Sequence, residues 1–398
     1  MTEQLTTPMP ESSSRKLGLE MTVAALARLL LNTSRRFAYP FAPALARGLG
    51  VPLVSITSLI ALNQLTGVLS PLFGPVSDRW GYRTMMLLGL GLMSIGMLTG
   101  GFVPFYLTIL IALFLAGLGK NIFDPALQAY IGERVPYERR GTVVGLIEMS
   151  WAGATLVGIP MVGLLIEHFS WRAPFLVMGG LGLVSIAMLG ALFSGGTRRS
   201  EQGAGAITFG QAWRQLSCSS AAVGMLAFAF LTSLANDNLF VVYGAWLEDS
   251  FALGVAALGT ATTVIGVAEL SGEVLTASLA DRVGLRRGVT VGLFLSALGY
   301  LLLPIIAQSL PLALAGLFLV FVIFEFTFVT AISLVTEVLP EARATMMASY
   351  IAVAGVGRVV GALIGGPLWV WGGLTAIGVV SAAIVLIAFV VFWRSVRL

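Results

Sequence analysis

The sequence contains one histidine, His168, and one cysteine, Cys218, and charged residues fill only 11% of its 398 positions. A single cysteine excludes an intrachain disulfide. A single histidine at a predicted helix end gives no basis for a metal site, and the chain has no HExxH motif. The stretch GLGKN (117–121) lacks the first glycine and the Ser or Thr of a phosphate-binding loop. We therefore expect no metal, no cofactor, no ATP-driven step and no enzymatic chemistry.

The scarcity of charge also argues against an ordinary soluble protein, in which about 25% of residues are charged. Hydrophobic residues make up 57% of the chain, and the net charge of +4 is not gathered on one face or tail as in nucleic-acid-binding proteins. A membrane chain of this length has room for about twelve spans of ~20 residues. The polar start of the chain (1–17) has no signal-peptide pattern, and we expect it to be a cytoplasmic tail.

Apolar runs between polar or Gly/Pro-rich breaks predict an all-α integral membrane protein with twelve transmembrane helices. The predicted spans lie near 18–46, 53–77, 84–103, 105–131, 142–167, 172–194, 217–247, 254–279, 288–307, 310–336, 345–370 and 373–393. A linker (195–216) separates two six-helix bundles, 18–194 and 217–393, and a short tail (394–398) follows.

The basic residues predict the orientation in the membrane. Of the 23 lysines and arginines, 16 lie in the two tails and in alternate loops, whereas the opposite loops hold only Arg47 and Arg172. By the positive-inside rule, both termini face the cytoplasm, and we expect a protein of the cell (plasma) membrane.

Two loops of the first bundle recur in the second. GPVSDRWGYR (74–83) ends the second span and ASLADRVGLR (277–286) ends the eighth, so Asp78 and Asp281 are 203 positions apart (281 − 78). ERVPYERRG (133–141) and EVLPEARA (337–344) place Pro136 and Pro340 at nearly the same separation. The chain is therefore predicted to contain two pseudo-symmetric copies of one six-helix unit.

With these motifs the sequence resembles the major facilitator superfamily (MFS) of secondary transporters over essentially the whole chain. The family's loop motif, Gly-x-x-x-Asp-Arg-x-Gly-x-Arg, is matched completely in the first copy, and the second copy departs from it only at Ala277. The matching positions are Gly74, Asp78, Arg79, Gly81, Arg83, Asp281, Arg282, Gly284 and Arg286. We expect the glycines to allow close packing and tight turns, and the arginines of the first copy to reach anionic lipid headgroups.

The resemblance to the drug/proton antiporters of the family is weaker. The arginine that many members carry in span four is Leu113 here, and the span-five antiporter motif survives only as GIPMVG (158–163).

Ionisable residues inside the spans are missing from spans three, six, nine and twelve. The resemblance implies that these four helices are peripheral, and a charge facing lipid costs several kcal/mol. In span one, Arg28, Asn32, Arg35 or Arg36, and Tyr39 recur at helical spacing and form a polar stripe. We expect this stripe to face a central cavity.

The repeat also predicts what the arginines meet. Adding 203 to Arg35 and Arg36 leads to Asn238 and Leu239, next to Asp237, so we predict an ion pair between the arginine doublet and Asp237 that either gates the cavity or anchors two helices. The predicted substrate-binding or gate residues are Asn32, Arg35, Arg36, Tyr39, Asn236, Asp237, Asn238 and Arg358.

Acids inside the spans are candidates for proton coupling, which needs a carboxyl group that gains and loses a proton. Glu325 is the leading candidate because it lies between phenylalanines (VIFEFTF) without a local partner, although Arg358 could neutralise it. Asp124 lies one turn from Lys120 and is expected to stay ionised as its partner. A structural ion pair is the alternative role for every acid. The full set of candidates is Glu325, Glu269, Glu273, Glu148 and Asp124.

These features predict a secondary active transporter that moves a small organic molecule by alternating access. One version is proton-coupled export of an amphipathic or lipophilic compound, and the other is a carrier of organic anions that uses Arg35 and Arg36. An integral-membrane enzyme is a remote alternative. The expected partners are a small-molecule substrate, membrane lipids and H+, with sodium as the alternative ion and no nucleic acid. We expect the chain to act as a monomer.

Overall fold

A computed structural model describes residues 11–69, 73, 76, 80–135, 137–193, 217–338 and 343–396, and every secondary-structure element in these ranges is helical. The first half comprises α1 (Glu11–Arg36), α2 (Ala42–Leu49), α3 (Leu53–Leu65), η1 (Thr66–Leu69), α5 (Tyr82–Phe102), α6 (Tyr106–Arg134), α7 (Tyr137–Gly153), η2 (Ala154–Gly158), α8 (Ile159–His168) and α9 (Ala173–Leu192). The second half comprises α11 (Ser220–Phe240), α12 (Tyr243–Phe251), α13 (Val255–Val283), α14 (Leu285–Ile306), α15 (Leu310–Val338) and α16 (Arg343–Ser395).

Helix lengths agree with the predicted spans. Nine helices in the described ranges are long and apolar enough to cross a membrane, or ten if the pair α2 and α3–η1, bent by 116°, is taken as one span. Among the nine, α16 has 53 residues, or about 80 Å at 1.5 Å per residue, which is more than twice the thickness of the hydrocarbon core. It is broken at Gly372 and Gly373, where φ is 57° at Gly373, and so contains predicted spans eleven and twelve.

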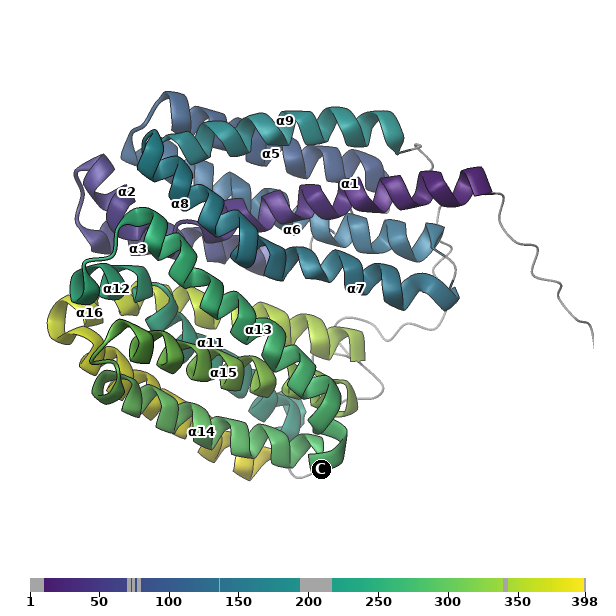
Figure 1. Cartoon of the computed structure of the whole chain (residues 1–398). Helices are drawn as coiled ribbons and strands as arrows, with labels where there is room; N and C mark the ends of the chain where they lie inside the picture. The colour runs from purple at the N-terminus through teal and green to yellow at the C-terminus, as the bar shows by residue number, and fades with distance from the viewer. Residues whose placement is uncertain are drawn as a thin grey trace, which may run out of the picture.

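The molecule is built as two helical bundles lying side by side (Figure 1). In that view α5 and α9 form one outer edge, and α14 with the end of α16 forms the other. These are the four charge-free spans, three, six, nine and twelve. The start of α1 and the C-terminus lie at the same end of the molecule.

The internal repeat is visible in the backbone. Gly81 and Gly284, which are 203 positions apart (284 − 81), precede α5 and α14 with φ of 85° and 88°, a conformation that favours glycine. Two positions further on, Arg83 donates a hydrogen bond to the carbonyl of Gly190, and Arg286 lies 5.5 Å from the ring centre of Trp393. Gly190 and Trp393 are again 203 positions apart (393 − 190).

The remaining motif residues are placed only in part. Arg83 binds the end of α9 instead of reaching outward as predicted. Gly74, Asp78 and Arg79 fall outside the described residues. Arg282 lies in the last turn of α13, which also contains Asp281.

The two halves meet at the end of the molecule away from the termini. There Arg47 of α2 and Glu248 of α12 form an ion pair of 2.5 Å, and the Glu167 carboxylate accepts a 2.8 Å hydrogen bond from the Ala256 backbone amide at the start of α13. Helix pairs α8/α13 and α3/α16 also pack across the boundary. These contacts close that end of the interface between the halves.

Within the second half, the first segment of α16 packs closely on α11. A Cβ added at Gly361 would lie 2.5 Å from the carbonyl oxygen of Leu234 and 2.9 Å from Cβ of Asp237. This close approach holds Arg358, one turn earlier on α16, beside the end of α11 that carries Asp237.

We predict that Gly361→Ala lowers the thermal unfolding midpoint of the purified protein by several degrees. The added methyl group meets backbone atoms, and such overpacking costs typically about 1–3 kcal/mol. Gly355→Ala on the same helix is the matched control, because nothing lies within 4 Å of a Cβ added there. Equal midpoints for the two variants would show that the contact between α16 and α11 is looser than described.

Candidate functional site

A cavity lies between the two halves. Its volume is about 170 Å³, against roughly 10–15 Å³ for one water molecule, so it can hold a small organic molecule. Its lining comes from both halves: Arg35, Arg36, Tyr39, Gln64 and Trp151 from the first, and Asn236, Asp237, Phe240, Glu269, Phe321, Phe324, Glu325, Phe328, Val329, Ile332 and Arg358 from the second.

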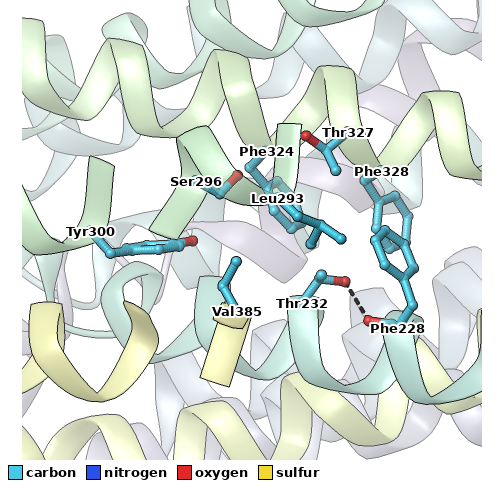
Figure 2. Close-up of a pocket in the computed structure, with 9 residues that line it drawn as sticks. All are labelled: Phe228, Thr232, Leu293, Ser296, Tyr300, Phe324, Thr327, Phe328 and Val385. Atoms are coloured by element: carbon cyan, nitrogen blue, oxygen red, sulfur yellow. Dashed lines mark hydrogen bonds between the residues drawn. The ribbon is translucent and has the colours of Figure 1, made fainter. Parts of the chain in front are cut away.

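A second pocket, inside the second half, is too small for a ligand. Figure 2 shows it between the aromatic rings of Phe228, Tyr300, Phe324 and Phe328, with room for about 10 Å³, or one water. Phe324 and Phe328 line both spaces, so the pocket lies directly behind the aromatic wall of the central cavity. The central cavity is therefore the candidate site.

Arg36 forms the strongest polar contact between the halves. Its guanidinium binds both carboxylate oxygens of Glu269 on α13, at 2.6 and 3.2 Å, and both side chains are buried. The guanidinium also lies 4.3 Å from the ring centre of Trp151 and 5.5 Å from that of Phe240. A bidentate pair stacked on aromatic rings suits the planar arginine head group.

The predicted ion pair between the doublet and Asp237 is not present. Arg36 pairs with Glu269, and Arg35 is joined to Asp237 only indirectly, through two neutral side chains. Arg35 donates to the Gln64 side-chain oxygen, the Gln64 amide donates to the Tyr39 hydroxyl, and Tyr39 donates to Asp237 Oδ1 at 3.2 Å. Asp237 and both arginines line the same cavity, but the arginines point to Gln64 and Glu269 instead of Asp237.

Four charged groups of the cavity have no ion-pair partner among the described residues: Arg35, Arg358, Asp237 and Glu325. Arg35 is on α1 and Arg358 on α16, so they face the cavity from opposite halves. The two positive charges act on each other electrostatically, and Arg358 and Arg35 both act on Asp237.

Other predicted charges form a structural cluster within the first half. Arg28 binds Asp124 at 3.1 Å and Glu148 at 2.9 Å, and Lys120 forms its predicted ion pair with Asp124. Arg28 also donates to the Ile147 carbonyl at 2.9 Å. Because each acid meets a cation here, Asp124 and Glu148 are occupied as ion-pair partners that join α1, α6 and α7.

The predicted asparagines and Glu273 have smaller roles. Asn32 donates to Ser150 and Asn238 to Ser381, at 3.4 and 3.5 Å, so both bind neighbouring helices of their own half. Asn236 lines the cavity and accepts a 3.4 Å hydrogen bond from Tyr300. Glu273 is exposed one turn beyond Glu269. In the described part of the chain, no group of three or more His, Cys, Asp or Glu side chains converges on a metal-sized point.

Eight lining residues were not among the predicted site residues: Gln64, Trp151, Phe240, Phe321, Phe324, Phe328, Val329 and Ile332. Gln64 stands out in the sequence as an amide within an otherwise apolar span (LNQL, 62–65), and this signal could have identified it. Trp151 could not be identified, because a tryptophan that lines a cavity looks the same in sequence as one that faces lipid or the membrane interface.

We predict that Arg36→Gln lowers the stability of the protein by about 3–5 kcal/mol, because the Glu269 carboxylate is left buried without its partner. Combining it with Glu269→Gln should recover most of this loss. Thermal unfolding of both single variants and the double variant measures the effect. If the double variant loses the sum of the single losses, Arg36 and Glu269 do not act as a pair.

Comparison with known proteins assigns the chain to a family. The family model of the Major Facilitator Superfamily matches residues 24–235 and 225–397. The chain is 26% identical over 363 residues to the MFS-type transporter YwfA of Bacillus subtilis (strain 168), covering 88% of this chain and 85% of that protein. It is 28% identical over 373 residues to monocarboxylate transporter 12 of Rattus norvegicus, covering 85% and 75%.

Solved structures share the fold. The nucleoside transporter NupG superposes with a TM-score of 0.81 at 12% identity, covering 95% of this chain and all (100%) of that one. The two helical bundles, the loop motif in the sequence and the matched family model lead to one conclusion: the chain belongs to the major facilitator superfamily and is a secondary transporter of small molecules.

Proposed function

We propose that the protein carries a small amphipathic organic anion, together with protons, by alternating access. The observation that carries this proposal is the pair Arg35 and Arg358. Both line the cavity from opposite halves, and neither has an ion-pair partner among the described residues. Because buried charges are normally paired, two unpaired guanidiniums across a cavity favour an anionic ligand, and carboxylate is a good match for the guanidinium fork.

The rest of the lining supports an amphipathic substrate. Phe240, Phe321, Phe324 and Phe328 contribute an apolar part of the cavity lining, and the ring centre of Phe240 lies 5.5 Å from the Arg36 guanidinium. Phe240 and Phe321 contact each other with ring centres 5.4 Å apart. A ligand with an acidic group and a hydrocarbon or aromatic body would satisfy both the charged and the apolar part, as ligand sites usually combine an apolar lining with a few polar groups.

Alternating access is supported by where the halves touch. Four polar contacts join them among the described residues: Arg47–Glu248 and Glu167–Ala256 at the closed end, and Arg36–Glu269 and Tyr39–Asp237 at the cavity. A rocking motion that separated α2 from α12 would break them and open the cavity at that end. We propose that this end faces the outside, with both termini in the cytoplasm, and that the chain works as a monomer in the cell membrane.

Coupling to protons is supported by the acids of the cavity. Asp237 and Glu325 line the cavity and have no ion-pair partner among the described residues, whereas Asp124 and Glu148 are engaged with Arg28. The name of one relative, monocarboxylate transporter 12, agrees with an organic acid as substrate.

Proton-coupled export of a lipophilic neutral or cationic compound is the second candidate. The aromatic wall favours it, as does a relative named multi-drug resistance efflux pump PmrA homolog of Lactococcus lactis, 24% identical over 336 residues and 82% of each chain. In this version the repulsion between Arg35 and Arg358 would keep the two halves apart until a proton was transferred.

We predict that amphipathic carboxylates raise the thermal unfolding midpoint of the purified protein, because a ligand that binds only the folded state stabilises it. The panel is pentanoate, benzoate and phenylacetate, each beside its amide and its ammonium analogue. Arg35→Gln and Arg358→Gln should each weaken carboxylate binding about 30-fold or more, since removing one partner of a buried charge pair costs 2 kcal/mol or more.

Arg172→Gln is the matched control, since Arg172 is an exposed arginine that lies over Trp171 and does not line the cavity. It should leave carboxylate affinity unchanged. Stabilisation by the amides or ammonium compounds, with no response to carboxylates, would contradict the anion proposal and favour the lipophilic exporter.

A further inference from the structure

We infer that the carboxylate of Asp237 competes with the acidic group of the substrate for the positive charge of Arg35 and Arg358. An anion therefore binds there only when Asp237 carries a proton. Proton and anion then cross the membrane together, one for one. This inference rests on the proposed function, and it names the residue that takes the proton and the direction of coupling.

The charge balance of the cavity requires such a partner. Three positive side chains line the cavity: Arg35, Arg36 and Arg358. Three acids line it as well, and each is negative when ionised: Asp237, Glu269 and Glu325. The site is therefore neutral before the substrate arrives. A monovalent anion would leave it with one uncompensated negative charge in a medium of low dielectric constant, which is costly unless a proton enters as well.

Position selects Asp237 as the acid that takes the proton. Glu269 is bound to Arg36 through both carboxylate oxygens. Glu325 interacts electrostatically with Glu269, Glu273, Arg358 and Arg36. Asp237 interacts electrostatically with both unpaired arginines, and the hydrogen bonds of Gln64 and Tyr39 join it to Arg35.

The groups that face Asp237 come from four elements. They are Arg35 and Arg36 of α1, Tyr39 just beyond α1, Arg358 of α16 and Tyr300 of α14. Arg36 is neutralised by Glu269, and the two tyrosines are uncharged at neutral pH, so Arg35 and Arg358 are the unpaired charges against which Asp237 acts.

The hydrogen bonds keep Asp237 at this place in either protonation state. Its side chain is 3% exposed, and its oxygen accepts from Tyr39, which in turn accepts from Gln64, the partner of Arg35. The acid and the arginine with which it competes are therefore joined by one chain of side chains. When an anion occupies Arg35, the proton on Asp237 removes the repulsion between the two carboxyl groups.

The test is the affinity of the full-length purified protein for phenylacetate between pH 6 and 9, a range in which this probe stays ionised. For the wild-type protein we expect affinity to fall, at the upper end, tenfold per pH unit, which is the linkage expected for one proton bound with the anion. Asp237→Asn should bind phenylacetate with no pH dependence. Glu325→Gln changes the other unpaired acid of the cavity and so separates the two candidates, and it should keep the wild-type slope. Glu148→Gln is the matched control, because this acid is bound to Arg28 outside the cavity lining, and it should also keep the slope.

A second measurement needs no variant. In weakly buffered solution at the upper end of the range, wild-type protein should take up one proton for each phenylacetate bound, followed with a pH-indicator dye. In proteoliposomes, protons should enter with the anion.

These outcomes separate the two proposals. If Asp237→Asn keeps the slope, if Glu325→Gln removes it, if no proton is taken up or if protons move against the anion, the assignment of Asp237 is overturned while the anion site stands. If no carboxylate of the panel binds the wild-type protein at any pH, the proposed function fails, and this inference fails with it.

Discussion

A charge inside a membrane must meet an opposite charge, a hydrogen-bonding partner or water, because hydrocarbon offers none of these, and every polar feature of this transporter follows from that constraint. Its clearest expression is the bidentate pair between Arg36 and Glu269, which joins the two halves at the centre of the molecule. The cluster around Arg28 satisfies the same requirement inside the first half. The charged groups without an ion-pair partner among the described residues, Arg35 and Arg358 above all, line the central cavity.

The repeat provides the scaffold and then departs from symmetry at the site. Gly81 and Gly284 make the same turn, and Arg83 and Arg286 contact equivalent positions, so the two halves share one backbone plan. In the cavity the symmetry is lost, since the positions equivalent to Arg35 and Arg36 are Asn238 and Leu239. A symmetric scaffold suits a motion that opens either end, while binding one substrate needs different chemistry on its two sides.

Much of the fold could be predicted from the sequence because hydrophobic length, repeat spacing and charge-free spans are properties of the whole chain. The Lys120–Asp124 pair was also predictable, since both residues lie on one helix. The partner of Arg36 was not, because a fixed offset locates depth in the membrane but not the rotation of a helix or the reach of an arginine. Gln64 was overlooked for a related reason: an uncharged amide seldom marks a site until its neighbours are known.

The central claim is that Arg35 and Arg358, from opposite halves, hold the acidic group of the substrate between them. An experimental structure with bound bromophenylacetate, in which the bromine is located by its anomalous scattering, tests this most directly. The account predicts the carboxylate between the two guanidiniums and the bromine against Phe324 or Phe328. A carboxylate bound elsewhere in the cavity, or a ring lying between the arginines with its acid toward solvent, would contradict it.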